Sequence, residues 1–97
     1  MKKTIQPQHS TSRNFTHASN EVAKLLRRLQ KQELALVDIS GAQAALEALP
    51  LATGEFAQAV NRLRNAHRYA CVSEEGASHY ELQLLAASLK HLSQRYA

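Results

Sequence analysis

The chain of 97 residues is poor in several residue types, and each scarcity excludes a class of protein. A single cysteine, Cys71, excludes an internal disulfide and fits a reducing cytosol, so we expect a cytoplasmic protein. Three glycines are too few for a phosphate-binding loop, and no nucleophile motif or pair of facing carboxylates is present, so we expect no enzyme and no cofactor. No apolar run approaches the ~20 residues of a membrane span, and no apolar stretch follows Met1-Lys2-Lys3 as in a signal peptide, so we expect no membrane partner.

Five histidines are present, but they do not form a metal-binding pattern. His79 and His91 lie twelve positions apart, and His67 falls on the buried side of a predicted helix. With one cysteine in the chain, no ligand set has the spacing of a zinc site, so we expect no metal. Cys71 is expected to be a small buried side chain.

Positive charge is concentrated at the amino-terminal end of the chain. Lys2, Lys3 and Arg13 give residues 1–19 a charge of +3 with no acid, whereas residues 20–97 hold nine Lys or Arg against eight Asp or Glu. Residues 1–19 are also polar and lack periodicity, which predicts a disordered basic arm. Such an arm fits nucleic acid or an acidic surface, and it also fits a solvated tail that aids solubility.

Apolar residues recur at helical spacing through the rest of the chain. A helix from about 20 to 32 is predicted by the positions of Val22, Leu25, Leu26 and Leu29. The apolar stretch 34–39 either continues this helix or forms a short buried strand. A short alanine-rich helix, 41–49, begins with the capping-box pattern Ser40-Gly41-Ala42-Gln43 and stops at Pro50. A third helix, capped by Thr53, has the buried stripe Phe56, Val60, Leu63 and His67.

The short helix, the turn at Pro50 and the helix from Gly54 form a helix-turn-helix candidate. The surrounding pattern is Glu47-Ala48-Leu49-Pro50-Leu51, then Phe56, Val60 and Arg62-Leu63-Arg64-Asn65-Ala66. Over about residues 35–83 it resembles the bacterial winged helix-turn-helix regulators of the ArsR and MarR type. Their wing is a β-hairpin, for which Tyr69–Ser73 and Ser78–Leu82 would be the strands and Glu74-Glu75-Gly76 the tip. The tip is acidic where the family usually carries cations, and the cysteines of its metal sensors are absent.

The resemblance implies a sequence-specific DNA-binding transcriptional regulator, mostly α with a small β-hairpin, in which residues 20–97 form the winged domain. The recognition helix would be 54–66, where Gln58 reads adenine, Arg62 reads guanine or grips phosphate, and Asn61 or Asn65 does either. Thr53 would meet a phosphate, and the cations of the arm would attract double-stranded DNA. A homodimer would form through the terminal helix, by the 3-4 spaced stripe Leu82, Leu85, Leu89, Leu92 and Tyr96.

The stretch around Glu74 also allows a different interpretation. Ser73-Glu74-Glu75 and Ser78-His79-Tyr80-Glu81 are both patterns that start helices, and a helix from about 78 to 96 would replace the wing. The fold would then be an all-α four-helix bundle without a wing. In that case we expect a small helical protein–protein interaction module, such as an adaptor, antitoxin, chaperone or inhibitor. The DNA-binding interpretation requires the side chains of Gln58, Asn61 and Arg62 to project together from one helix.

Overall fold

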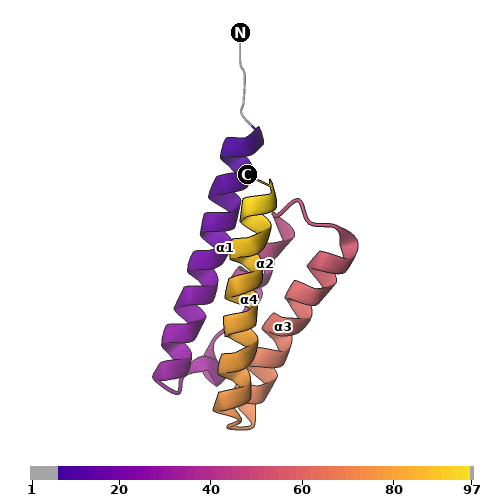
Figure 1. Cartoon of the computed structure of the whole chain (residues 1–97). Helices are drawn as coiled ribbons and strands as arrows, with labels where there is room; N and C mark the ends of the chain where they lie inside the picture. Colours follow the sequence, from indigo (N-terminus) through magenta and orange to yellow (C-terminus); the bar gives the residue numbers. More distant parts are fainter. Residues whose placement is uncertain (1–6, 97) are drawn as a thin grey trace.

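The computed structural model describes residues 7–96, and its regular elements within that range are all helical. The elements are α1 (Pro7–Gln30), a short 3-10 helix η1 (Leu34–Leu36), α2 (Ser40–Glu47), α3 (Thr53–Cys71) and α4 (Glu75–Tyr96) (Figure 1). No strand occurs among the described residues, so the predicted winged helix-turn-helix fold with its β-hairpin is wrong. The alternative, an all-α four-helix bundle without a wing, is confirmed.

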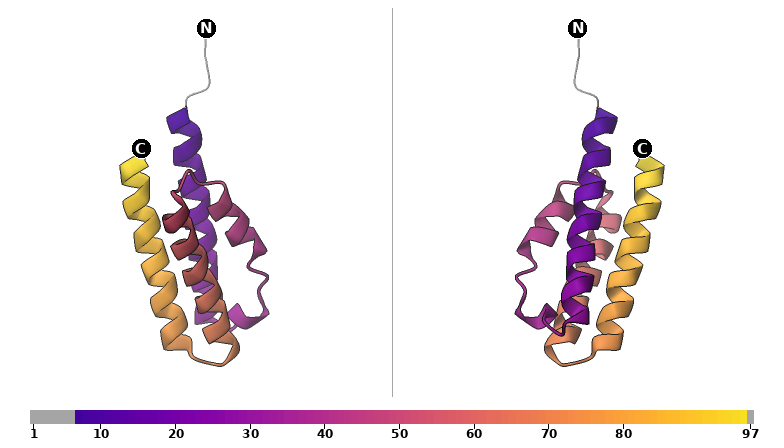
Figure 2. Two further views of the ribbon diagram at one scale, coloured as in Figure 1. Left: turned by 90° about the vertical axis from the view of Figure 1, so that its right-hand side faces the viewer. Right: turned by 90° about the vertical axis from the view of Figure 1, so that its left-hand side faces the viewer.

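The helices run antiparallel to their neighbours and form a bundle with four corners. α4 lies between α1 and α3 and contacts both of them, while the shorter α2 contacts α1 and α3 on the other side (Figure 2). α1 and α3 therefore occupy opposite corners of the bundle. Each of these two helices keeps one long face directed away from the rest of the described chain.

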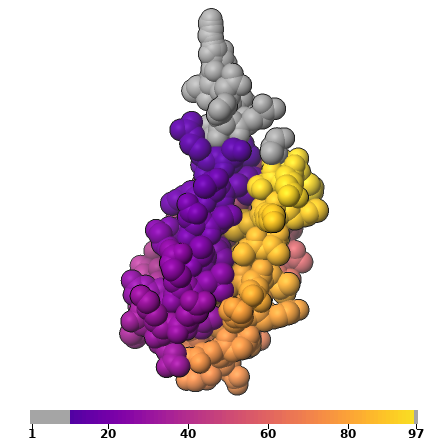
Figure 3. All heavy atoms as spheres, turned by 60° about the vertical axis from the view of Figure 1, so that its left-hand side comes forward, coloured from indigo at the N-terminus to yellow at the C-terminus, as the bar shows by residue number. Residues whose placement is uncertain are grey.

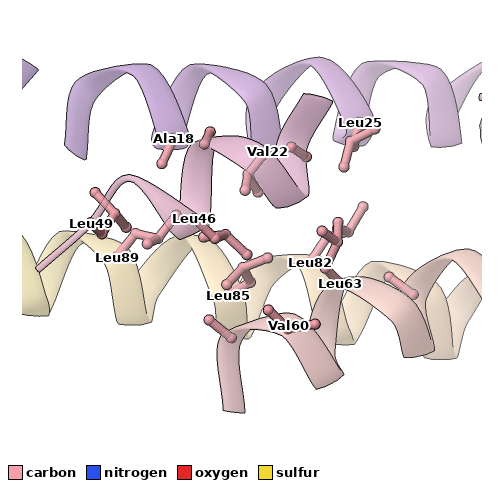
Figure 4. Packing of buried hydrophobic residues seen from close by; sticks show 14 of the residues in the cluster. Ala18, Val22, Leu25, Leu46, Leu49, Val60, Leu63, Leu82, Leu85 and Leu89 are labelled. Atoms are coloured by element: carbon pink, nitrogen blue, oxygen red, sulfur yellow. The ribbon is translucent and has the colours of Figure 1, made fainter. Parts of the chain in front are cut away.

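The core is made mostly by leucine and alanine, since only 5% of the residues are aromatic. The stripe of α4 supplies its centre, since Leu82, Leu85 and Leu89 are fully buried among side chains of the other helices (Figure 4). One polar side chain joins them: Ser78 is completely buried, and its Oγ donates a hydrogen bond of 2.7 Å to the carbonyl oxygen of Ala66 in α3. Satisfying this hydroxyl lets the first turn of α4 pack tightly against α3.

The first helix is much longer than predicted. The disordered arm predicted for residues 1–19 is wrong for 7–19, which belong to α1. Two buried side chains explain the difference, because Phe15 is 2% exposed and Ala18 is 1% exposed. The ring of Phe15 stacks on that of Tyr96 at a centroid distance of 6.1 Å, so the end of α4 covers the beginning of α1. Lys2 and Lys3 lie outside the described residues.

The reversal that replaces the wing is a helix C-cap built on a residue other than glycine. Ser73 adopts a left-handed conformation with φ of 61°. The N–H of Ser73 bonds the carbonyl of Ala70, and the N–H of Glu74 bonds that of Tyr69, which is the hydrogen-bond pattern of a Schellman motif. Glu74 and Glu75 then stand at the start of α4, where the helix dipole favours acids. The acidic tip of the predicted wing is therefore a helix start.

α1 ends with the same kind of C-cap, in which a residue other than glycine takes the left-handed conformation. Gln32 has φ of 60°, and the N–H groups of Gln32 and Glu33 bond the carbonyls of Leu29 and Arg28. The chain then enters η1, which places Leu34 in the core and leaves Leu36 87% exposed. Neither a continued helix nor a strand forms over 34–39, the two outcomes predicted for this stretch.

Both helices of the predicted helix-turn-helix are present, but their starts are capped differently. α2 begins at Ser40, whose backbone N–H donates a hydrogen bond of 2.9 Å to Oδ1 of Asp38. This hydrogen bond is the main reason that the pKa of Asp38 is lowered. α3 begins at Thr53, and its N-cap is Ala52. The side chain of Glu55 accepts the N–H of Ala52 at 3.1 Å, so Glu55 rather than Thr53 provides the side-chain contact at this helix start.

Candidate interaction surfaces

The face of α3 that was predicted to read DNA is only partly available. Gln58 and Asn61 are exposed and point outward from the corner of the bundle. Arg62 is turned towards α4, where its Nη1 lies 3.2 Å from Oε1 of Glu81, and the two side chains are 31% and 15% exposed. The predicted trio of Gln58, Asn61 and Arg62 therefore does not project as one group, because a carboxylate of the same chain holds its cation.

The rest of the predicted DNA contacts are divided between surfaces. Thr53 is exposed at the start of α3, and Asn65 accepts a hydrogen bond from Arg68. Arg13 lies on α1, at the opposite corner from the recognition helix. Sequence reasoning missed the exposed side chains of Arg64 and Arg68 on α3. Their positions relative to the predicted buried stripe could have identified them as outward-facing.

The leucines predicted to form a dimer interface are buried in the core of a single chain. Leu82, Leu85 and Leu89 are 0% exposed and Leu92 is 5% exposed, all through contacts within one chain. Tyr96 packs at the edge of the same core. These side chains offer no surface to a second copy, so a homodimer would need a different interface. The 3-4 spacing predicted an amphipathic helix, and the helices that α4 packs against are α1 and α3 of the same chain.

Tyr96 instead takes part in a cluster that joins the end of α4 to the start of α3. The carboxylate of Glu55 accepts hydrogen bonds from Arg95 at 2.9 Å and from the Tyr96 hydroxyl at 3.1 Å, in addition to the Ala52 N–H. The pKa of Glu55 is lowered by the backbone bond first, and by Tyr96 and Arg95 next. The same contact with Glu55 raises the pKa of Tyr96. We call Glu55, Arg95 and Tyr96 the Glu55 cluster.

The strongest concentration of charge is on the outward side of α1. Five exposed cations and one histidine lie on that side of the helix and define the basic face: Arg13, His17, Lys24, Arg27, Arg28 and Lys31. From the first to the last they span about 27 Å of helix. Two acids border the face, since Lys24 pairs with Glu21 at 2.8 Å and Arg28 with Glu33 at 3.0 Å.

Three cations of the basic face form no ion pair within the described part of the chain: Arg13, Arg27 and Lys31. Near its end, Lys24, Arg27, Arg28 and Lys31 surround a shallow hollow of about 430 Å³. The sequence-based prediction assigned Arg13 to a disordered arm. Only the helical path of residues 7–19 brings Arg13 and His17 onto the same line as Lys24.

A groove runs beside the basic face, between α1 and α4. Figure 3 shows the two helices side by side with this seam between them. The groove has a volume of about 500 Å³ and contains no acidic side chain; its lining residues are Ser12, Phe15, Thr16, Ser19, Asn20, Ala86, Lys90, Ser93 and Gln94. Phe15 lies beneath the groove and is only 2% exposed, Ala86 is half-buried, and hydroxyl and amide groups form most of the lining.

Other chemistry is sparse in the described residues. No three His, Cys, Asp or Glu side chains among residues 7–96 are placed to hold a metal ion. The Nε2 atom of His67 is buried and has no hydrogen-bond partner among residues 7–96. Cys71 was predicted to be buried, but it is exposed. None of the described helices has both the length and the apolar character needed to cross a bilayer.

The chain matches no model of a known protein family, no curated protein and no solved structure.

Proposed function

We propose that this protein is a helical protein–protein interaction module that binds an acidic partner through the basic face of α1. The observation that carries the proposal is the line of outward cations over about 27 Å of one helix, three of them without an ion pair in the described chain. Charge arranged in this way attracts an acidic surface and sets its orientation. An exposed thiol at Cys71 fits a reducing compartment, so the proposal includes a cytoplasmic location.

The separation of charges favours this function over a sequence-specific regulator. A DNA reader needs base-reading side chains and phosphate-binding cations on one surface, because phosphate contacts fix the position from which bases are read. Here the α3 face and the basic face occupy opposite corners, and Arg62 is held by Glu81. The leucines that were to pair two recognition helices lie in the core of a single chain.

Sequence-specific DNA binding remains the second candidate, and one observation favours it. The exposed part of α3 carries Gln58, Asn61, Arg64 and Arg68 with no exposed acid between them. Such a face suits the major groove, where amide and guanidinium groups read base edges. The α3 face would have to bind DNA without a wing and without contacts from the basic face of α1.

Paired charge reversals separate the two candidates. The variant Arg27→Glu with Lys31→Glu changes the basic face, and Arg64→Glu with Arg68→Glu makes the same change of net charge on α3. Binding of poly-L-glutamate and of a random-sequence DNA duplex would be measured by fluorescence anisotropy across a salt series. We expect the α1 variant to bind polyglutamate about tenfold more weakly than the wild type, a loss of about 1.4 kcal/mol, while the α3 variant stays close to the wild type.

Two results would overturn the proposal. If the α3 variant alone lost affinity for the duplex, the recognition-helix candidate would replace it. If the wild type at physiological salt bound duplex more than about tenfold tighter than polyglutamate at equal charge concentration, the basic face would be assigned to nucleic acid.

A further inference from the structure

We propose that the shallow hollow at the end of the basic face binds a phosphorylated side chain of the acidic partner. This inference rests on the proposed function and names the chemical group that the basic face recognises. The hollow has a volume of about 430 Å³, and every residue that lines it is a cation: Lys24, Arg27, Arg28 and Lys31. We call these residues the cationic quartet.

Helical spacing brings the cationic quartet together. Its members occupy positions i, i+3, i+4 and i+7, which share one side of a helix. Lys31 directly follows α1, but its N–H still bonds the carbonyls of Arg27 and Arg28, so it continues the helical path. From Lys24 to Lys31 the quartet spans about 10 Å along the axis. The positive charges therefore surround a space in which one ligand group can contact more than one of them.

The members of the cationic quartet differ in whether they have partners. Two of them pair with acids of the same chain, Glu21 and Glu33, at N–O distances of 2.8 and 3.0 Å. Arg27 and Lys31 form no ion pair within residues 7–96. Residues at i and i+4 have their Cβ atoms about 6 Å apart, so a single anion can reach both of these side chains.

The two acids also restrict the size of the anion. Glu21 comes before the cationic quartet in the chain and Glu33 comes after it, so a carboxylate lies near each end of the hollow. A row of phosphates along the helix, as in a nucleic acid, would approach these carboxylates, which disfavours it. A compact anion seated between the acids would avoid them and still meet the unpaired cations.

A phosphate monoester satisfies these conditions better than a carboxylate does. Phosphoserine carries a charge of about −1.5 to −2 and has three strong acceptor oxygens. The guanidinium of Arg27 can bond two of these oxygens in the bidentate manner typical of arginine and phosphate, which leaves the third for Lys31. A glutamate of the partner offers one charge and two oxygens, so it cannot give both cations the same contacts. Clusters of this kind commonly recognise phosphorylated segments of proteins.

The test compares short acidic peptides on the full-length protein. One glycine–glutamate peptide carries a central phosphoserine, and its counterpart carries Glu-Glu at that point, which gives a similar charge on two separate groups. Binding would be followed by fluorescence anisotropy, and the site mapped by amide chemical-shift changes in the ¹⁵N-labelled protein. The hollow variant is Arg27→Gln, and its matched control is Arg13→Gln, an exposed cation of the same face about 21 Å away that also lacks an ion pair within residues 7–96.

We expect the phosphoserine peptide to bind about tenfold tighter than the Glu-Glu peptide and to shift the amides of residues 24–31. Arg27→Gln should reduce this preference to less than about twofold, while Arg13→Gln should weaken both peptides equally and leave the preference intact. Arg27→Lys keeps the charge but loses the planar fork, so its preference should lie between those of the wild type and Arg27→Gln. An unfolding curve of each variant confirms that the fold is retained.

The failures of the two proposals are distinguishable. Equal affinity for the phosphoserine and Glu-Glu peptides would overturn the phosphate site, while polyglutamate binding that depends on the basic face would leave the proposed function in place. A preference reduced as much by Arg13→Gln as by Arg27→Gln would overturn the hollow as its location. Tighter binding of inorganic tripolyphosphate than of the phosphoserine peptide would assign the hollow to a free phosphate compound and overturn a phosphorylated partner. If neither the peptides nor polyglutamate bound, both proposals would fall.

Discussion

At the scale of single residues, one carboxylate ties together segments that are distant in the sequence. Glu55 caps the start of α3 through the Ala52 N–H and binds Arg95 and Tyr96 at the end of α4. Tyr96 in turn stacks on Phe15 of α1. Glu55, which the sequence places on the exposed side of a helix, therefore links α3 to α4 directly and to α1 through Tyr96.

The lowered pKa of Glu55 makes this joint sensitive to acid. Because the folded state favours the ionised carboxylate, its stabilising contribution is complete above the ordinary value of 4.5 and is lost as the pH falls through the lower pKa of the folded protein. Glu55→Gln should thus lower the urea midpoint of unfolding at neutral pH, and its difference from the wild type should shrink below pH 4.5. The control is Glu47→Gln, an exposed acid on α2. A Glu55→Gln difference that stayed constant with pH would contradict this assignment.

At the scale of elements, the decisive feature is that α1 starts early. Its first three turns are polar except for a few apolar residues, and Phe15 and Ala18 are the ones that the bundle buries. A polar helix of this kind forms because a few well-buried contacts hold it, since tertiary packing commonly overrides weak local preference. The early start also brings Arg13 and the groove residue Ser12 into the candidate surface.

Phe15→Ala tests whether the beginning of α1 is part of the fold. Removing a large side chain that is 2% exposed should lower the free energy of unfolding by about 3–5 kcal/mol, as measured by urea denaturation. Thr16→Ala, at the next and exposed position of the same helix, should change it by less than about 0.5 kcal/mol. If Phe15→Ala were as stable as the wild type, residues 7–19 would behave as the disordered arm that the sequence suggested.

At the scale of the whole molecule, the bundle satisfies its own apolar stripes within one chain. Each long helix places its leucines and alanines towards the other helices, and the described exterior retains only three large exposed apolar side chains, Leu36, Val72 and Tyr80. The fold consequently uses the α4 stripe for the stability of a single chain.

Leu89→Ala distinguishes a core leucine from a dimer contact. Leu89 is fully buried within the chain, so the substitution should lower the free energy of unfolding by about 2–5 kcal/mol. The urea midpoint of wild type and variant should also be independent of protein concentration between micromolar and near-millimolar samples. A midpoint that rises with concentration would show that association contributes to stability and would support the dimer. Gln83→Ala, exposed on the same helix, is the control.

Local patterns were sufficient for some conclusions about this protein. The 3-4 stripes predicted the central parts of the long helices, Pro50 marked the end of α2, and Ser73-Glu74-Glu75 indicated a helix start, because helical periodicity and capping act over a few neighbouring residues. The two reversals were harder to locate, since Gln32 and Ser73 take the left-handed conformation that usually signals its presence through glycine. Without a glycine to mark the turn, the hairpin was preferred over the helix start as the interpretation of residues 69–83.

The sequence by itself thus indicated the central parts of the amphipathic helices and which of their sides are apolar. Only the tertiary structure decided what those sides contact: Leu85 is buried in the core of its own chain rather than against a second copy, and Arg62 pairs with Glu81. It also decided that Arg13 and Lys24 share one surface while Arg64 lies at the opposite corner. The physical reason is that spacing specifies the period of a helix, whereas the partner of each face depends on packing between residues far apart in the chain.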